Sequence, residues 1–158
     1  MIKQIEITDL NRCAEVIRES FATVAAEFGL TEQNCPKHTS FVKTEALRKQ
    51  FDSGTLMLGY FENCEMVGYV SIHKADDNSY ELNNLAVLPC CRHKGYGKEL
   101  MDYCVIKVRE LGGHKITIGI IEENTQLKDW YAAYGFIHTG TRKFDHLPFT
   151  VGFMEFEL

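Results

Sequence analysis

Apolar and polar residues repeat with two different spacings along this chain. Seven short segments mostly alternate between apolar and polar positions, a pattern that predicts β-strands. Four others carry apolar residues three and four positions apart, which predicts helices. The predicted helices start after residue 8, at residue 43, near residue 95 and at residue 125. The predicted strands are residues 2–8, 55–61, 66–73, 79–87, 115–121, 136–141 and 149–156. Strands and helices therefore alternate from end to end, as in an α/β protein.

Turn-forming residues mark the ends of several of these elements. Thr8 or Asp9 can cap the first helix, and Gly29 ends it. A Gly-Gly pair at 112–113 ends the third helix. We find no internal repeat, low-complexity tract or linker. The pattern therefore predicts one domain over residues 1–158.

The composition is that of an ordinary globular protein. Of the 158 residues, 45% are hydrophobic and 25% charged, and a chain of this length buries roughly 70% of its unfolded surface. No run approaches the ~20 apolar residues of a membrane span, and the first residues lack the apolar core of a signal peptide. We therefore expect a cytoplasmic protein without a membrane partner. The net charge of −5 argues against a nucleic-acid partner.

Six cysteines are scattered along the chain and form no Cys-x-x-Cys pair. Without a signal peptide, reduced thiols are the expected state. Cys35 and His38 form an isolated Cys/His pair, too few ligands for structural zinc. We expect no bound metal.

A glycine-containing segment, Arg92-x-x-Gly95-x-Gly97, lies between the strand that ends at Val87 and the third helix. A loop that leads into a helix start presents several backbone N–H groups in one direction, and the helix dipole adds positive potential there. Arg92, Lys94 and Lys98 bring positive charge to the same point. The segment therefore predicts a site for phosphate oxygens. A tight turn without a ligand is the alternative.

Three other phosphate-binding motifs match this sequence less well. A P-loop needs Lys-Ser/Thr after its last glycine, and Glu99 follows Lys98. A dinucleotide-binding turn needs a third glycine where Leu100 stands. A protein-kinase loop requires a much longer chain.

The stretch from Leu85 to Leu100 resembles the acetyl-CoA motif of the GNAT superfamily of acetyltransferases, in which a strand runs into Arg/Gln-x-x-Gly-x-Gly/Ala and then a helix. A second segment also matches: Asn124 stands seven residues before Tyr131, and Tyr131 four residues before Gly135-Phe136. The resemblance implies the GNAT fold, a mixed, mostly antiparallel sheet of about seven strands flanked by about four helices. It also implies transfer of an acetyl group from acetyl-CoA to an amine.

The same resemblance assigns residues to the acetyl-CoA site. The backbone N–H of Val87 is expected to bind the thioester carbonyl where the strand pairing is locally broken. Asn124 is expected to cap its helix, to bind the pantetheine arm, or both. The residues expected to bind acetyl-CoA are Leu85, Ala86, Val87, Arg92, His93, Lys94, Gly95, Tyr96, Gly97, Lys98, Asn124 and Tyr131.

Two residues are candidates for proton transfer. Glu81 is placed to deprotonate the amine through a water molecule, because alternation puts Glu81, Asn83, Leu85 and Val87 on one face of the strand. A solvated or ion-paired Glu81 is the alternative, and His73 is a weaker candidate base. Tyr131 matches the general acid that protonates the leaving thiolate, whereas a packing role is its alternative. Trp130 and Tyr134 are expected only to pack the helix.

Cys90-Cys91 departs from the family pattern, which has an acidic and an aromatic residue there. We expect these cysteines to pack at the edge of the loop, and a reactive thiol is the alternative. Residues 21–41 are expected to form the acceptor wall. Glu27 and Glu32 are expected on a solvated face, and contact with a cationic substrate is the alternative. The aromatic-rich segment 144–149 is expected to line the opposite wall or a homodimer contact.

Two other functions remain open on the sequence. One is a non-catalytic acyl-CoA-binding sensor or interaction module, which would not need both Glu81 and Tyr131. The other is a nucleotide-dependent enzyme, which the missing Lys-Ser/Thr pair disfavours.

Overall fold

A computed structural model describes all 158 residues. It contains a seven-stranded sheet in the order β1-β2-β3-β4-β5-β7-β6 and four α-helices. The pairing of β4 with β5 is parallel, whereas β1 with β2, β2 with β3, β5 with β7 and β6 with β7 are antiparallel. The expected fold is confirmed. No helix is both long enough and apolar enough to cross a membrane.

The elements follow the predicted order. The strands are β1 Ile2–Gln4, β2 Leu56–Glu62, β3 Glu65–Lys74, β4 Ser79–Val87, β5 Lys115–Ile121, β6 Ile137–Lys143 and β7 Thr150–Glu157. The helices are α1 Leu10–Phe28, α2 Thr44–Asp52, α3 Tyr96–Glu110 and α4 Thr125–Tyr134, and short 3-10 turns cover η1 Ile7–Asp9, η2 Thr39–Phe41 and η3 Pro89–Cys91.

Contacts divide the chain into two compact units, which are described separately. The first unit comprises residues 1–73 and 82–104, and the second comprises residues 74–81 and 105–158. Strand β4 and helix α3 each give residues to both units.

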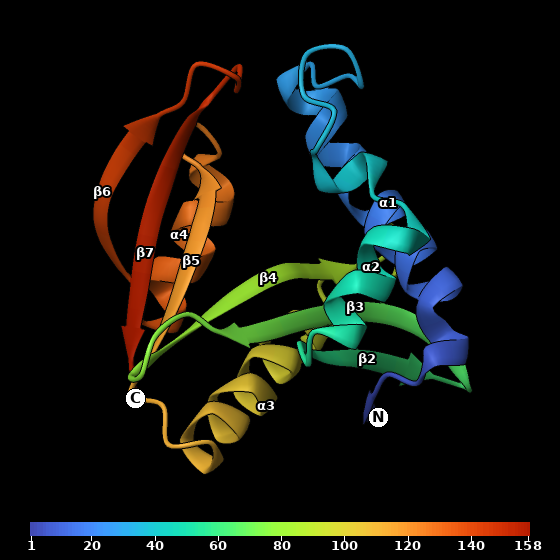
Figure 1. Ribbon diagram of the computed structural model, residues 1–158. Helices are drawn as coiled ribbons and strands as arrows, with labels where there is room; N and C mark the ends of the chain where they lie inside the picture. Colours follow the sequence, from blue (N-terminus) through green and yellow to red (C-terminus); the bar gives the residue numbers. More distant parts are fainter. The chain divides into compact units, whose positions relative to one another are not determined.

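In the first unit, α1 packs against α2 (Figure 1). Its buried positions Leu10, Cys13, Val16 and Ile17 recur three and four residues apart, as predicted. Gly29 ends the helix in the left-handed conformation, with φ +63°, and its N–H bonds to the Ala25 carbonyl.

The start of the chain differs from the prediction. Strand β1 ends at Gln4, and the 3-10 turn η1 replaces the rest of the predicted strand. The Asp9 carboxylate accepts the N–H of Glu6 at 3.0 Å. The Asp9 side chain therefore bonds back to the residue that precedes η1. It makes no capping bond to α1.

Strands β2 and β3 form a hairpin, which is joined at the predicted residues 62–65. Glu62 pairs with Glu65, so only Asn63 and Cys64 lie between the strands. Both have positive φ, 51° and 68°. Two successive residues with positive φ are characteristic of the two-residue turn that matches strand twist.

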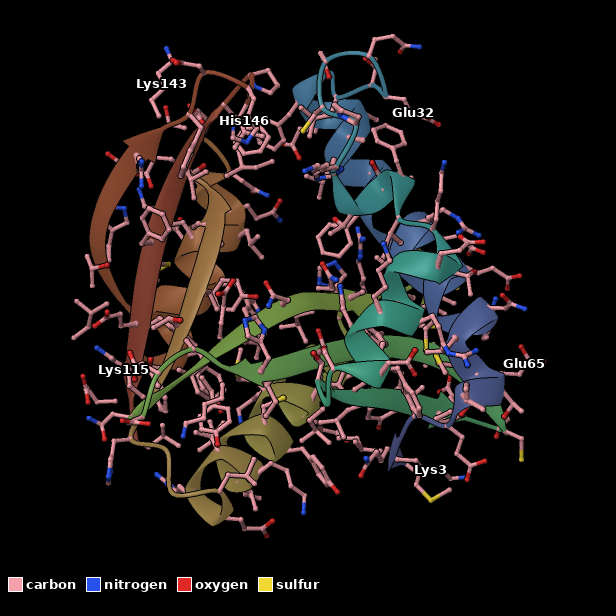
Figure 2. The ribbon with its side chains drawn as sticks, in the orientation of Figure 1. Lys3, Glu32, Glu65, Lys115, Lys143 and His146 are labelled. Atoms are coloured by element: carbon pink, nitrogen blue, oxygen red, sulfur yellow. The ribbon has the colours of Figure 1, made fainter.

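In the second unit, β5 pairs with the first three residues of β4 on one side and with β7 on the other. Lys115 of β5 forms an ion pair with Glu155 of β7 at 3.3 Å (Figure 2). Helix α4 packs through aromatic rings, with Tyr134 5.4 Å from Phe156 and Tyr131 5.2 Å from Phe136 between ring centroids. The packing role expected for Tyr134 is consistent with these contacts.

Candidate functional site

Strand β4 contains a left-handed residue in its second half. Asn84 has φ +56°, a conformation that interrupts the regular pleat of a strand. Asn83, Asn84 and Leu85 are all half-buried, so burial does not alternate there. Glu81, Asn83, Leu85 and Val87 are all half-buried, so the face predicted for them stays a prediction that Asn84 interrupts locally. A left-handed residue within β4 is the kind of irregularity that the predicted local break in strand pairing requires.

The segment after β4 turns sharply into α3. His93 and Gly95 have positive φ values of 62° and 89°, and both are exposed. Left-handed residues at such turns direct neighbouring backbone N–H groups to one side, which makes a concave anion site. The first N–H groups of α3, which begins at Tyr96, have no partner within the helix. We call residues 92–97 the phosphate loop.

Arg92, the first residue of this loop, bonds to three oxygen atoms of the protein, and we call this set of bonds the Arg92 clamp. Its Nε donates to the Val87 carbonyl at 3.2 Å. Its Nη2 donates to the Ser20 carbonyl at 2.7 Å and to the Thr23 hydroxyl at 3.2 Å. Arg92 thus joins the end of β4 to helix α1. Arg92, which we predicted from the sequence to bind phosphate, therefore directs these hydrogen bonds to the protein itself.

Lys94 of the loop and Lys98, which follows the loop, also have carboxylate partners. Lys94 lies 3.5 Å from Glu62, and Lys98 lies 2.7 Å from Asp102. The positive charge expected from the sequence at this point is therefore partly neutralised in the structure. The backbone N–H groups are left as the main donors for an anion.

A pair of stacked tyrosines supports the loop from β2. The rings of Tyr60 and Tyr96 are 4.2 Å apart between centroids. The Tyr96 hydroxyl donates to Glu62, and the Tyr60 hydroxyl donates to Glu99 at 2.9 Å. The bond from Tyr96 and the charge of Lys94 lower the pKa of Glu62, and the bond to Glu62 raises the pKa of Tyr96 to about 12. These contacts span more than thirty residues, so no sequence pattern predicted them.

In the second unit, Asn124 caps helix α4. Its Oδ1 accepts the N–H of Leu127 at 3.2 Å, and the residue is buried. This is the capping geometry expected from the sequence. The cap uses only Oδ1, and the role of Asn124 at the pantetheine arm stays a prediction.

Tyr131 lies in the middle of α4 and is buried. Its ring meets those of Trp130 and Phe136 edge-on, with centroids 5.0 Å and 5.2 Å away. The ring is thus held in one orientation by its neighbours. Packing of the ring and chemistry at the hydroxyl are compatible here.

Glu81 belongs to the short parallel ladder of β4 with β5, where it pairs with Thr117 in the second unit. His73, the weaker candidate base, lies in the first unit, 3.2 Å from Nδ2 of Asn83 through its Nδ1. An amide nitrogen can only donate, so this ring nitrogen is the acceptor. The lone pair that a base would need at Nδ1 is therefore already used.

An ionic cluster that no sequence pattern predicted lies just before the start of α4. Glu122 accepts from Lys128 and lies 2.9 Å from Nε2 of His138. The bond from Lys128 is the largest cause that lowers the pKa of Glu122, and His138 adds to it. A side chain at Gly152 would overlap the Glu122 carboxylate. The backbone of β7 therefore makes room for this cluster.

The expected acceptor wall contains an aromatic group in the first unit. His38 lies edge-on to Phe21 and Phe41, at 6.1 Å and 6.3 Å between centroids. Its Nδ1 accepts the N–H of Ser40 at 3.3 Å and lies 2.7 Å from the Ser40 hydroxyl. Burial lowers the pKa of His38, which favours the neutral ring. Because Nδ1 accepts the Ser40 N–H, the neutral ring carries its proton on Nε2.

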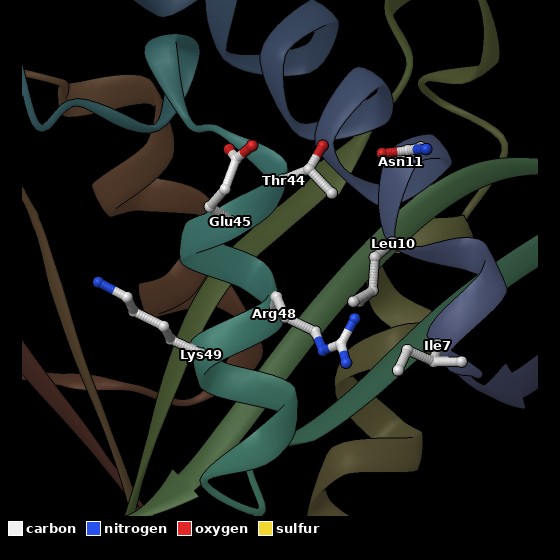
Figure 3. Close-up of a pocket in the computed structure, with 7 residues that line it drawn as sticks. All are labelled: Ile7, Leu10, Asn11, Thr44, Glu45, Arg48 and Lys49. Atoms are coloured by element: carbon white, nitrogen blue, oxygen red, sulfur yellow. The ribbon is translucent and has the colours of Figure 1, made fainter.

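A pocket of about 470 Å³ lies elsewhere in the first unit, between the start of α1 and one face of α2 (Figure 3). Leu10 and Ile7 give it an apolar side, while Glu45, Arg48 and Lys49 bring charge from α2. None of the predicted site residues lines this pocket. It is separate from the phosphate loop.

The structure thus brings ten of the predicted residues together in the first unit: Leu85, Ala86, Val87, Arg92, His93, Lys94, Gly95, Tyr96, Gly97 and Lys98. It places Glu81, Asn124 and Tyr131 in the second unit. No group of three or more His, Cys, Asp or Glu side chains is arranged to hold a metal ion.

The family model described as Acetyltransferase (GNAT) domain matches residues 27–156. An uncharacterized N-acetyltransferase of Mycobacterium tuberculosis is 30% identical over 79 residues, which are 50% of this chain and 51% of that protein. The chain thus spans about half the length of this curated relative.

Two solved structures share the fold. PaiA N-acetyltransferase from Thermoplasma acidophilum, in complex with coenzyme A, has a TM-score of 0.81 at 23% identity, covering 100% of this chain and 98% of that chain. The Salmonella typhimurium protein yncA, with its cofactor acetyl-CoA, has a TM-score of 0.75 at 20% identity, covering 100% and 93%.

Proposed function

Since the chain belongs to the GNAT acetyltransferase family, we propose that it transfers the acetyl group of acetyl-CoA to a primary amine of a small molecule or peptide. The observation that carries this proposal is the phosphate loop, with left-handed His93 and Gly95 directly before the first N–H groups of α3. That geometry suits the pyrophosphate of coenzyme A. The two structural neighbours, one in complex with coenzyme A and the other with acetyl-CoA, support the same donor.

Direct attack in a ternary complex is the proposed route. The amine must first lose a proton, because an alkylamine has a pKa near that of lysine, about 10.4. Glu81 is proposed to take this proton through a water molecule. The amine nitrogen then attacks the thioester carbon, and the N–H of Val87 stabilises the oxyanion.

Collapse of the tetrahedral intermediate breaks the C–S bond. Tyr131 is proposed to give its phenolic proton to the departing thiolate. Its buried ring, fixed between Trp130 and Phe136, supports this assignment because a general acid has to be held in one position. Asn124 is proposed to use its Nδ2 group on the pantetheine arm.

The acceptor is proposed to meet the aromatic group of Phe21, His38 and Phe41. Arg92 bonds to Ser20 and Thr23, the neighbours of Phe21 on α1, so this wall adjoins the end of β4 within the first unit. Residues 144–149 are proposed for the opposite wall or a homodimer contact, and the cytoplasm is the proposed location.

The test is a thiol-release assay with acetyl-CoA and a panel of polyamines, amino acids, aminoglycosides and peptide N-termini. We expect turnover with at least one amine class. Calorimetric titration with coenzyme A, ATP and NAD should show binding of coenzyme A alone. Tight binding of coenzyme A without turnover on any amine would support a sensor instead, and preference for ATP or NAD would contradict the proposed donor.

A further inference from the structure

Two adjacent cysteines lie directly before the phosphate loop. Cys90 and Cys91 are the last residues of η3, and their Sγ atoms are 3.6 Å apart. Cys90 is exposed, whereas Cys91 is only 7% exposed. The proposed acetyl transfer gives neither thiol a task.

The distance between the sulfurs indicates which chemistry suits the pair. A disulfide needs them about 2.0 Å apart on residues whose Cα atoms are usually at least ~4.4 Å apart, but neighbouring Cα atoms are only about 3.8 Å apart. Two thiolates bound to one tetrahedral centre through bonds of about 2.3 Å lie about 3.8 Å apart. The observed 3.6 Å is close to the second value. The two sulfurs therefore lie close enough together to share one centre, whereas a disulfide between these residues would be strained.

The number of protein ligands limits which metal or metalloid this pair of cysteines can bind. Structural zinc takes four protein ligands, and no third Cys, His, Asp or Glu joins this pair in a metal-binding group. Soft sulfur ligands select soft ions. We propose that Cys90 and Cys91 form a dithiol site for a soft, thiophilic metal or metalloid of low coordination number, and that its occupancy weakens coenzyme A binding at the phosphate loop.

Phenylarsine oxide is a suitable probe, because its arsenic binds two thiols and keeps a phenyl group as the third ligand. Two S–H bonds break, two As–S bonds form, and the arsenic-bound oxygen leaves with both protons as water. Arsenic stays trivalent, so no oxidant or reductant is needed.

The effect on the loop follows from the position of the pair. The N–H of Cys91 bonds to the Leu88 carbonyl at 2.8 Å, and the N–H of Arg92 bonds to the Pro89 carbonyl at 3.4 Å. A centre that bridges Cys90 and Cys91 ties two successive residues of this turn together and places its remaining ligand beside the phosphate loop. Arg92, the clamp to α1, comes next in the chain. This step rests on the proposed function, whereas the dithiol itself does not.

The experiment treats the reduced, full-length protein with phenylarsine oxide and records the intact mass and the affinity for coenzyme A. We expect one phenylarsenic adduct per chain and a roughly tenfold or greater loss of affinity, reversed by a small dithiol. Cys90→Ser and Cys91→Ser should each weaken adduct formation by roughly 10²-fold, because one thiol lacks the chelate advantage. Cys64→Ser is the matched control: it removes another exposed thiol and should change nothing.

Adducts that persist in both single variants, or that vanish in Cys64→Ser, would overturn the site. An adduct that leaves the affinity for coenzyme A unchanged would overturn its coupling to the loop. Failure of the untreated protein to bind coenzyme A would overturn the proposed function, and the dithiol site would then be judged by the mass measurement alone.

Discussion

Arg92 and Ser20, 72 positions apart in sequence, are joined by a 2.7 Å hydrogen bond from the guanidinium to the Ser20 carbonyl. A second bond, from Nε, reaches the Val87 carbonyl. The first residue of the motif therefore fixes the distance between helix α1 and the end of β4. In this chain the motif arginine is a positioning residue.

Arg92→Lys tests this role. A single ammonium group cannot reach all three oxygens, and hydrogen bonds to charged groups contribute about 1.5–3 kcal/mol each. Since Arg92 is partly exposed, we expect the free energy of unfolding to fall by about 1–3 kcal/mol, with a higher KM for both substrates. Urea unfolding and steady-state kinetics measure these. Arg109→Lys, an exposed arginine near the end of α3, is the control, and equal effects in both variants would refute the clamp.

Gly95→Ala should separate backbone conformation from crowding. Gly95 has φ +89°, and an added Cβ would meet no atom within 4 Å. The left-handed conformation costs a non-glycine residue about 1–2 kcal/mol, so stability should fall by about that amount and coenzyme A should bind more weakly. Gly112→Ala has the same open surroundings at φ +80° but lies beyond α3. It should lose similar stability and keep its affinity for coenzyme A; a parallel loss of affinity would show that the effect at Gly95 is indirect.

Tyr96→Phe removes the donor to Glu62 and keeps the ring that stacks on Tyr60. We expect the pKa of Glu62 to rise toward its ordinary value, because the Tyr96 hydroxyl is the largest cause that lowers it. The KM for acetyl-CoA should rise more than kcat falls. NMR titration of the Glu62 carboxyl checks the first point. Tyr60→Phe, which removes a donor to Glu99, should leave the pKa of Glu62 unchanged.

Tyr131→Phe tests the proposed general acid. The aromatic packing is retained, so the protein should fold and bind coenzyme A, while kcat should fall by roughly 10²–10⁴-fold. Tyr134→Phe, on the same helix, should leave kcat nearly unchanged. Single-turnover measurement of thiol release is the direct readout. Full activity of Tyr131→Phe would remove the residue from the acid role.

The ionic cluster at Glu122 predicts a dependence of stability on pH. A carboxyl whose pKa is lower in the folded state than its ordinary 4.5 stabilises the fold fully above that value, and this contribution disappears as the pH falls through the lowered pKa. The thermal midpoint of the natural protein should therefore exceed that of Glu122→Gln at neutral pH. The difference should shrink below about pH 4. A difference that stays constant down to low pH would mean that the carboxylate charge contributes nothing.

The fold was largely predictable because periodicity is a local property. β4, β5 and α4 have the predicted boundaries, and the Asn124 cap was expected from its position. The early end of β1 at Gln4 and the left-handed conformation of Asn84 were not predicted. They depend on side-chain hydrogen bonds and φ values that the alternation of apolar and polar residues does not encode. The Arg92 clamp and the Tyr96–Glu62 bond join residues more than thirty positions apart. Only the folded chain reveals that the loop's cations already have partners.

Gly152 and Glu122 have a consequence for how this sequence can diverge. A side chain at position 152 would overlap one oxygen of the Glu122 carboxylate, and that carboxylate holds both Lys128 and His138. Because this oxygen is the end of a flexible side chain, a larger residue at position 152 requires Glu122 to turn away from these two partners or to be replaced. Changes at Gly152, Glu122, Lys128 and His138 should therefore depend on one another among descendants of this protein.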